Sequence, residues 1–387
     1  MDEFEDRAVA TLVGGAVGDA LGGATEGWTH EQIEQRWGGP VTGIVGPYHQ
    51  DWRTARPMSP YHKGDGHITD DTLMTHALVR VYDRLARHLD AYAVDSDLVP
   101  EMVDERHWIP ELETETVLLQ RVFLAEKWLV LRLRYGHNDP REAGVGNLVN
   151  CGAAMYIAPV GVVNAGDPEG AYAEAIDMAG AHQSSYGREA AGVLAAAVAE
   201  AMATGATVDS VVAVAQELAK DGTRDAVAAV VAAARDIGPE VQADAFAFAR
   251  ALRESVLPYD TVGPVYRQPA LDSRKPSRTK AIEELPIALG YLVATGGDFR
   301  RGVLGAVNYG RDSDSIAGMV GSLAGALGGT AAVPAEWADA IEEASRTDLR
   351  APGRTLAAVA RKIAEDDRAR LEQRWRRREA SVAVAGS

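Results

Sequence analysis

The chain has 387 residues, which allows one large domain or two to three domains of ordinary size. Its 56 Asp and Glu residues outnumber its 39 Lys and Arg residues, and the formal net charge of −17 argues against a nucleic-acid partner, because phosphate repels an acidic protein. Cys151 is the one cysteine, which excludes an intrachain disulfide and a zinc site built from several thiolates. We therefore predict a protein of the reducing cytoplasm.

We expect neither an export signal nor a membrane partner. Residues 2–6 are acidic where a secretory signal would be basic. Two uncharged stretches, residues 143–166 and 315–335, are long enough to span a bilayer. Both are rich in glycine and contain proline, and the first also contains asparagines, so they are predicted to be buried core segments instead.

The apolar residues recur at helical spacing, and this pattern predicts an all-α architecture. No linker divides the core, so we expect a single compact domain over residues 1–378 and a flexible C-terminal tail at 379–387. Glycine and proline punctuation sets the limits of the elements. The predicted helices lie, in chain order, near residues 4–25, 71–89, 111–134, 168–181, 187–204, 207–221, 223–237, 240–254, 280–295, 298–308, 315–328, 335–347 and 354–377.

Three glycines in the first predicted helix are spaced four residues apart. Gly14, Gly18 and Gly22 therefore lie on one face, where small residues allow another helix or a ligand to approach closely. A dinucleotide-binding glycine loop is excluded, because that motif follows a strand whereas residues 8–13 have a helical pattern. Packing alone is the simpler interpretation of this face.

Two long segments have no helical pattern. Residues 38–69 are rich in Gly, Pro, His and Trp, and they are predicted to form an ordered loop that leads into a helix. Residues 256–279 contain four prolines, and the stretch 267–280 is basic. This basic loop either faces an anionic ligand or is simply solvated, and the sequence leaves both alternatives open.

Two clusters of carboxylates and hydroxyls stand at predicted helix starts, one at residues 69–72 and the other at residues 312–315. Each cluster alone is explained by helix capping, because Thr, Ser and Asp are favoured at N-termini. Together they offer four carboxylates and several hydroxyls, an all-oxygen donor set that suits magnesium, manganese or calcium. If the two helix starts converge, the carboxylates repel one another unless a cation lies between them.

These motifs resemble the ADP-ribosylglycohydrolase family in three blocks that occur in the family order. The blocks are Gly18-Asp19-Ala20-Leu21-Gly22 with Glu26, then Thr69-Asp70-Asp71-Thr72, then Gly310-Arg311-Asp312-Ser313-Asp314-Ser315-Ile316-Ala317. The resemblance covers roughly residues 8–330 and implies an all-α domain whose cleft holds two Mg²⁺ or Mn²⁺ ions. By motif match, the implied metal ligands are Thr69, Asp70, Asp71, Asp312, Asp314 and Ser315, the last of which replaces the family's usual threonine.

The resemblance also implies which residues meet the substrate. Glu26 matches the family's acidic residue near the metals and the scissile ribose, and we take Glu26 and Asp312 as the catalytic candidates. The candidates for substrate binding are Asp71, Tyr156, His182 and Arg311. His182 matches a family histidine, although a lone histidine is more often structural.

Two departures from the family pattern concern the substrate. Tyr156, within residues 150–159, replaces an arginine of the family, and Arg311 stands where a small residue is common. A tyrosine would stack on a planar ring instead of contacting phosphate, or it would simply fill the core.

The predicted activity is hydrolysis of an N-glycosidic bond to ribose, with Glu26 as general base or holding a substrate hydroxyl. The expected substrate carries ADP-ribose, and the sequence leaves open whether it is an ADP-ribosylated protein or a small N-ribosyl compound. The alternatives are a free nucleoside-like or nucleotide-like N-ribosyl metabolite, or a non-catalytic structural role of the kind that a lens crystallin with this fold has. The sequence leaves the native metal, the leaving group and the oligomeric state open.

Overall fold

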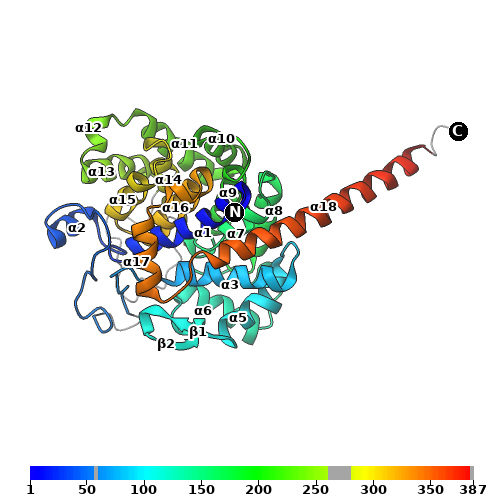
Figure 1. Cartoon of the computed structure of the whole chain (residues 1–387), viewed down its shortest axis with the longest axis horizontal. Coiled ribbons are helices and arrows are strands. Elements are labelled where there is room, and N and C mark those ends of the chain that lie inside the picture. Colours follow the sequence, from blue (N-terminus) through cyan, green and yellow to red (C-terminus); the bar gives the residue numbers. More distant parts are fainter. Residues whose placement is uncertain (56–59, 260–279, 384–387) are drawn as a thin grey trace.

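The computed structural model of the chain describes residues 1–55, 60–259 and 280–383. Within these ranges the protein is helical apart from one two-stranded hairpin, which confirms the predicted all-α fold (Figure 1). None of the described helices combines the length and the apolar character needed to cross a bilayer.

The centre of the fold is a close pair of helices, α1 (Glu3–Gly22) and α16 (Ser313–Gly328). A Cβ atom on Gly18 would lie 2.0 Å from the carbonyl oxygen of Ala317, and one on Gly22 would lie 2.4 Å from that of Ser313. These distances are too short for any side chain, so the two backbones touch only because the facing residues are glycines. The predicted glycine face is thus confirmed as a packing surface between helices.

The other helices surround this pair, and α15 packs on α16 while the first half of α18 lies along α1, α3 and α7 (Figure 1). Within the described ranges they are α2 (His30–Trp37), α3 (Asp70–Leu85), α4 (Ala91–Ala93), α5 (Val99–Val103), α6 (Leu124–Val130), α7 (Ala158–Val163), α8 (Pro168–Gly180), α9 (Ser185–Ala201), α10 (Val208–Leu218), α11 (Asp221–Asp236), α12 (Pro239–Gln242), α13 (Ala245–Val256), α14 (Lys280–Ala294), α15 (Phe299–Tyr309), α17 (Ala335–Ser345) and α18 (Ala351–Ala383).

Most predicted helices agree with these bounds to within about one turn. The prediction at 240–254 is divided between α12 and α13, and the sequence pattern does not predict α2 or the short helices α4, α5 and α7. As expected, residues 38–55 and 60–69 form a loop that leads into α3. In the predicted loop 256–279, η7 (Leu257–Tyr259) is a short 3₁₀ turn, and residues 260–279 lie outside the described ranges.

The predicted helix at 111–134 is wrong over its first half. Strands β1 (Arg106–Ile109) and β2 (Thr114–Val117) pair antiparallel there, and a 3₁₀ turn that begins at Pro110 joins them. The β-branched residues of β2 favour a strand. A helix begins only at Leu124, where α6 leads into a π-helical turn, η4 (Leu131–Tyr135).

The C-terminal helix is longer than predicted. It continues to Ala383 instead of ending near 377, so the start of the expected tail at 379–387 is helical and residues 384–387 lie outside the described ranges. Beyond its packed first half, α18 projects away from the body of the molecule (Figure 1).

Candidate metal centre

Three elements that are distant in sequence bring carboxylates together: α1, the start of α3 and the start of α16. Asp19, Asp71 and Asp314 are buried, and each offers a carboxylate oxygen such that the three atoms lie within 4.8 Å of one another. The Ser315 hydroxyl donates to Asp71 Oδ2 at 2.9 Å. The two acidic clusters therefore converge, as the sequence predicted, while their role as metal ligands stays a prediction.

Asp19 is the member of this group for which the sequence predicted no role. Its carboxylate accepts hydrogen bonds from the backbone N–H of Thr69 at 3.0 Å and of Thr72 at 3.2 Å. It also accepts from both threonine hydroxyls, the Thr69 Oγ1 contact being 2.5 Å. Asp19 thus joins α1 to the first turn of α3. The sequence feature that could have drawn attention to Asp19 is its position as a carboxylate within a run of glycine and small apolar residues.

Burial raises the pKa of four neighbouring carboxyls, those of Asp19, Asp70, Asp71 and Asp314. For Asp71 the neighbouring carboxylates add to burial and raise the pKa further. For Asp314, His62 opposes the burial effect, while Asp312 and Glu26 add to it. For Asp19, hydrogen bonds from Thr69 and Thr72 oppose the burial effect. Burial raises the pKa of Asp70 to about 7, although Arg121 opposes it from 4.0 Å. The cluster therefore holds more negative charge than the protein around it compensates.

The geometry fits a divalent cation. Oδ1 of Asp314 is buried and makes no hydrogen bond within the described part of the chain, which is costly for a carboxylate oxygen unless a cation lies beside it. The surrounding donors are carboxylates and hydroxyls, the hard ligands that Mg²⁺ and Mn²⁺ prefer.

A second group lies directly beside the first. Cys151, Glu284 and Asp312 offer ligand atoms within 4.8 Å of one another. The Cys151 Sγ lies 3.2 Å from Asp312 Oδ2 and 3.3 Å from Ser315 Oγ, so its single hydrogen is within reach of both oxygens and Ser315 connects the two groups. Cys151 and Glu284 were not predicted as site residues, because neither belongs to one of the two acidic clusters at the helix starts. Each of the two adjacent groups brings together ligand atoms that could hold a metal ion.

A wall of buried charges, formed by His62, Glu111 and Arg121, lies against the site on the side of the hairpin. His62 Nε2 lies 3.2 Å from Asp314 Oδ2, and its Nδ1 lies 3.3 Å from the carboxylate of Glu111. The guanidinium of Arg121 donates to Glu111 at 2.5 Å. Burial alone would raise the pKa of Glu111, but Arg121 and His62 lower it to about 2. None of these three residues was predicted from the sequence.

Glu26 stands at the edge of the centre, in the loop after α1. It is half-buried, and its charge is among those that raise the pKa of Asp314. The next residues hold this loop against the start of α16: Gly27 N–H donates to the Arg311 carbonyl, and Arg311 N–H donates to the Trp28 carbonyl at 2.7 Å. Glu26 is therefore near Asp314 without belonging to either group.

The remaining candidates for substrate binding are buried. Tyr156 is 2% exposed, and its hydroxyl lies 3.2 Å from Nδ1 of His182, whose Nε2 lies 3.3 Å from Glu126. The Arg311 side chain is also buried, and its Nε lies 2.5 Å from Glu283. Substrate contact by these residues stays a prediction, and their burial favours the structural interpretation.

The fold and this site define a class of protein: an all-α domain with a buried carboxylate centre where three helices meet. The chain belongs to the ADP-ribosylglycohydrolase family, whose model matches residues 1–376. This membership confirms the resemblance of the three motif blocks and supports a glycohydrolase of that type.

A solved structure described as an "ADP-ribosylglycohydrolase-related protein complex" has a similar fold, with a TM-score of 0.61. The match covers 93% of this chain and 100% of that chain at 22% sequence identity, so it supports the fold alone. No curated protein matches the sequence.

Proposed function

We propose that the protein is a metal-dependent hydrolase that cleaves an N-glycosidic bond to ribose in an ADP-ribosylated substrate. The observation that carries the proposal is the convergence of Asp19, Asp71 and Asp314, with Oδ1 of Asp314 buried and not hydrogen-bonded within the described residues. Three buried carboxylates at this spacing are compensated most simply by divalent cations.

The residues that would hold these cations are the two clusters at the helix starts. They are Thr69, Asp70, Asp71, Asp312, Asp314 and Ser315. Two ions are supported by two adjacent donor groups that share Ser315, and the predominance of oxygen donors favours Mg²⁺ or Mn²⁺. When bound, such ions polarise substrate oxygens and lower the pKa of a coordinated water.

The chain's own carboxylates would contribute in two further ways. Cleavage of the bond to ribose develops positive charge on the sugar, and a carboxylate outside the predicted metal ligands, such as Glu26, stabilises that charge. Glu26 is half-buried at the edge of the centre, where a carboxylate oxygen can accept the proton of the attacking water or hold a ribose hydroxyl. Asp312, which is also half-buried, is the most exposed member of the predicted ligand set.

The alternative substrate, a free N-ribosyl metabolite, is favoured in the sequence by Tyr156, as a ring that could stack on a planar leaving group, and by the loop 256–279, most of which lies outside the described residues. Its ring lies against His182 with ring centroids 5.9 Å apart, and only 2% of the residue is exposed. The structure thus offers no open aromatic face at this position. The retained carboxylates argue against the non-catalytic alternative, because an unused site has no reason to keep them buried together.

The experiment that tests the proposal is turnover of ADP-ribosyl-arginine, ADP-ribosyl-serine and a nucleoside panel with Mg²⁺ or Mn²⁺. We expect release of ADP-ribose, with Glu26→Gln lowering kcat on the order of 10²-fold or more while the bound metal is retained. Glu365→Gln, an exposed glutamate of α18, is the matched control. Full activity of Glu26→Gln would remove Glu26 from the mechanism, and turnover of nucleosides alone would replace the proposed substrate.

A further inference from the structure

The distal half of α18 is exposed to solvent in the described part of the chain. Residues 368–382 are all exposed, and this stretch extends from the body as a free helix (Figure 1). Helices in proteins are stabilised mainly by packing of one face, and an isolated stretch of this length is marginal in water. Its own pairs, such as Arg368 with Glu372 at 3.3 Å, are exposed and contribute little.

This free segment carries an apolar stripe. Leu371, Trp375 and Val382 are 51%, 65% and 72% exposed. At about 100° of rotation per residue, the three side chains fall within an arc of about 40° on the helix surface. A surface stripe that includes tryptophan is the usual form of a helix that packs on another protein surface.

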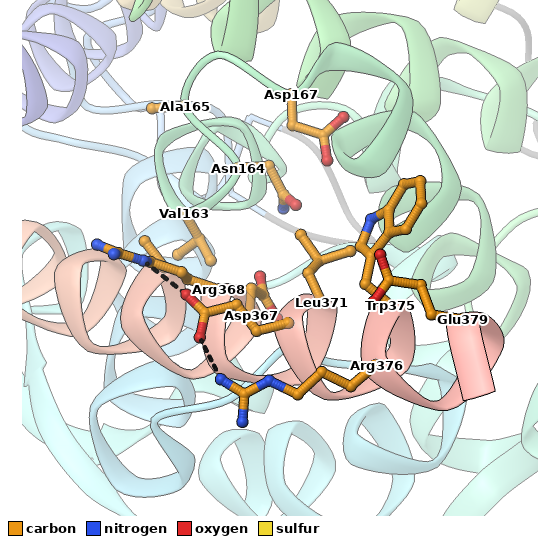
Figure 2. A pocket seen from close by; sticks show the side chains of 12 residues that line it. Val163, Asn164, Ala165, Asp167, Asp367, Arg368, Leu371, Trp375, Arg376 and Glu379 are labelled. Carbon is orange, nitrogen blue, oxygen red and sulfur yellow. Dashed lines mark hydrogen bonds and ion pairs between the residues drawn. The ribbon is translucent and has the colours of Figure 1, made fainter.

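The stripe begins beside a groove. A cavity of about 590 Å³ lies between α18 and the end of α7, and Leu371 and Trp375 line it from the helix while Val163, Asn164 and Asp167 line it from the body (Figure 2). An apolar side chain from a partner can therefore enter between the helix and the body.

The charge of the segment is opposite to that of the rest of the chain. Residues 368–382 contain six arginines and two glutamates, a net charge of +4, whereas the remainder of the chain carries −21. Each molecule thus holds a basic helix with an apolar stripe and an acidic body that is complementary to it. A polyanion such as a nucleic acid would meet the same helix but would be repelled by the body.

We propose that residues 368–382 form a dimerisation arm that packs on the acidic body of a second copy of this chain. Because each copy supplies one arm and one body, a reciprocal contact closes a symmetric pair. The arm would bury Leu371 and Trp375 at the centre, with the arginines placed around them as a charged rim.

The test is the mass of the full-length protein in solution, measured by light scattering and sedimentation over a range of concentration and salt. We expect a species of twice the 41.2 kDa chain mass. Leu371→Ser with Trp375→Ser should weaken dimerisation on the order of tenfold or more. Arg374→Glu with Arg377→Glu and Arg378→Glu should weaken it as well, as should raising the salt from about 0.1 M to 1 M, where screening is strong.

The matched control is Leu131→Ser, because Leu131 is 54% exposed on the body and lies outside the arm. It should leave the mass unchanged, and circular dichroism should show that all variants keep their helices. A monomer at every concentration overturns the proposal, as does a dimer that is indifferent to the α18 variants. Binding of the monomer to anionic vesicles or to duplex DNA through the arm overturns it in favour of that other partner.

Discussion

The candidate metal centre lies between two regions that are built in different ways. On one side α1 and α16 meet backbone to backbone, and glycines such as Gly18 leave no room for a side chain. On the other side a wall of paired charges, formed by His62, Glu111 and Arg121, approaches the same carboxylates. In the first region the helices are positioned by close backbone contact, so no additional side-chain atom fits between them. In the second region the side chains are positioned by ion pairs, so both partners of a pair must be replaced together.

The largest effect is expected from breaking the contact between α1 and α16. Gly18→Val places a Cβ atom 2.0 Å from the Ala317 carbonyl oxygen, so the helices must separate. We expect a loss of unfolding free energy on the order of 5 kcal/mol, or failure to fold. Gly39→Ala is the control, because a Cβ there meets nothing within 4 Å. Chemical denaturation of both variants measures the difference, and a similar stability for the two would contradict the shape argument.

Breaking the wall should have a slightly smaller effect. Arg121→Met leaves the buried Glu111 without its guanidinium partner, and we expect a loss of about 3–5 kcal/mol. The double variant Glu111→Leu with Arg121→Met should recover part of that loss, because the Glu111 carboxylate and its guanidinium partner are then removed together while His62 keeps its contact with Asp314. Arg134→Ala, which removes an exposed pair with Asp104, is the control and should change little. A double variant as unstable as the single one would show that the wall acts through packing.

The contribution of ion pairs to stability can also be tested by changing the pH, at His88, which lies away from the metal centre. His88 bridges Glu174 at 2.5 Å and Asp367 of α18 at 2.7 Å. The bond to Glu174 raises the pKa of His88 to about 9, against the opposing effect of burial. A raised histidine pKa stabilises the fold below about pH 6.5, and that contribution is lost as the pH rises through 9.

We therefore expect the wild-type protein to lose about 1–2 kcal/mol more than His88→Leu between pH 6.5 and 9.5. Urea denaturation at several pH values checks this difference. Parallel stability curves for the two proteins would show that His88 does not hold α18 to the body by charge.

The smallest effect is expected at Tyr156. Tyr156→Phe removes one hydrogen bond to His182 and keeps the ring in place, so stability should fall by about 1 kcal/mol. We expect the ratio of kcat/KM between ADP-ribosylated and nucleoside substrates to stay unchanged, because the ring is 2% exposed and lies against His182. A change in that ratio would restore Tyr156 as a determinant of specificity.

The two regions also differ in how far the sequence predicts them. Glycines four residues apart and runs such as Thr69-Asp70-Asp71 are local patterns, and helix geometry converts them directly into a close contact and a helix start. The wall consists of single residues in loops and turns with no shared period. Leu118 and Val122 have helical spacing, although the segment forms a hairpin and a 3₁₀ turn. Both side chains are buried, so their spacing indicates burial and not a helical backbone.

Within the site, convergence of the two acidic clusters was predictable in part, and their neighbours were not. The motif blocks shared with the family are enough to assign Asp71, Asp312 and Asp314 to one predicted ligand set. The contacts of Cys151 and Glu284 with that group depend on where α14 and the turn at residues 151–153 pack, which only the tertiary structure determines.

The most direct test of the account is the metal content of the wild-type protein and of Asp314→Asn, measured by elemental analysis and titration calorimetry. We expect the wild type to bind Mg²⁺ or Mn²⁺ with two sites per chain, and Asp314→Asn to bind at least about tenfold more weakly with its helices intact. Asp366→Asn, an exposed carboxylate of α18, should bind like the wild type. A wild type that binds neither ion at millimolar concentration, or an Asp314→Asn variant with unchanged affinity, would contradict the shared metal centre.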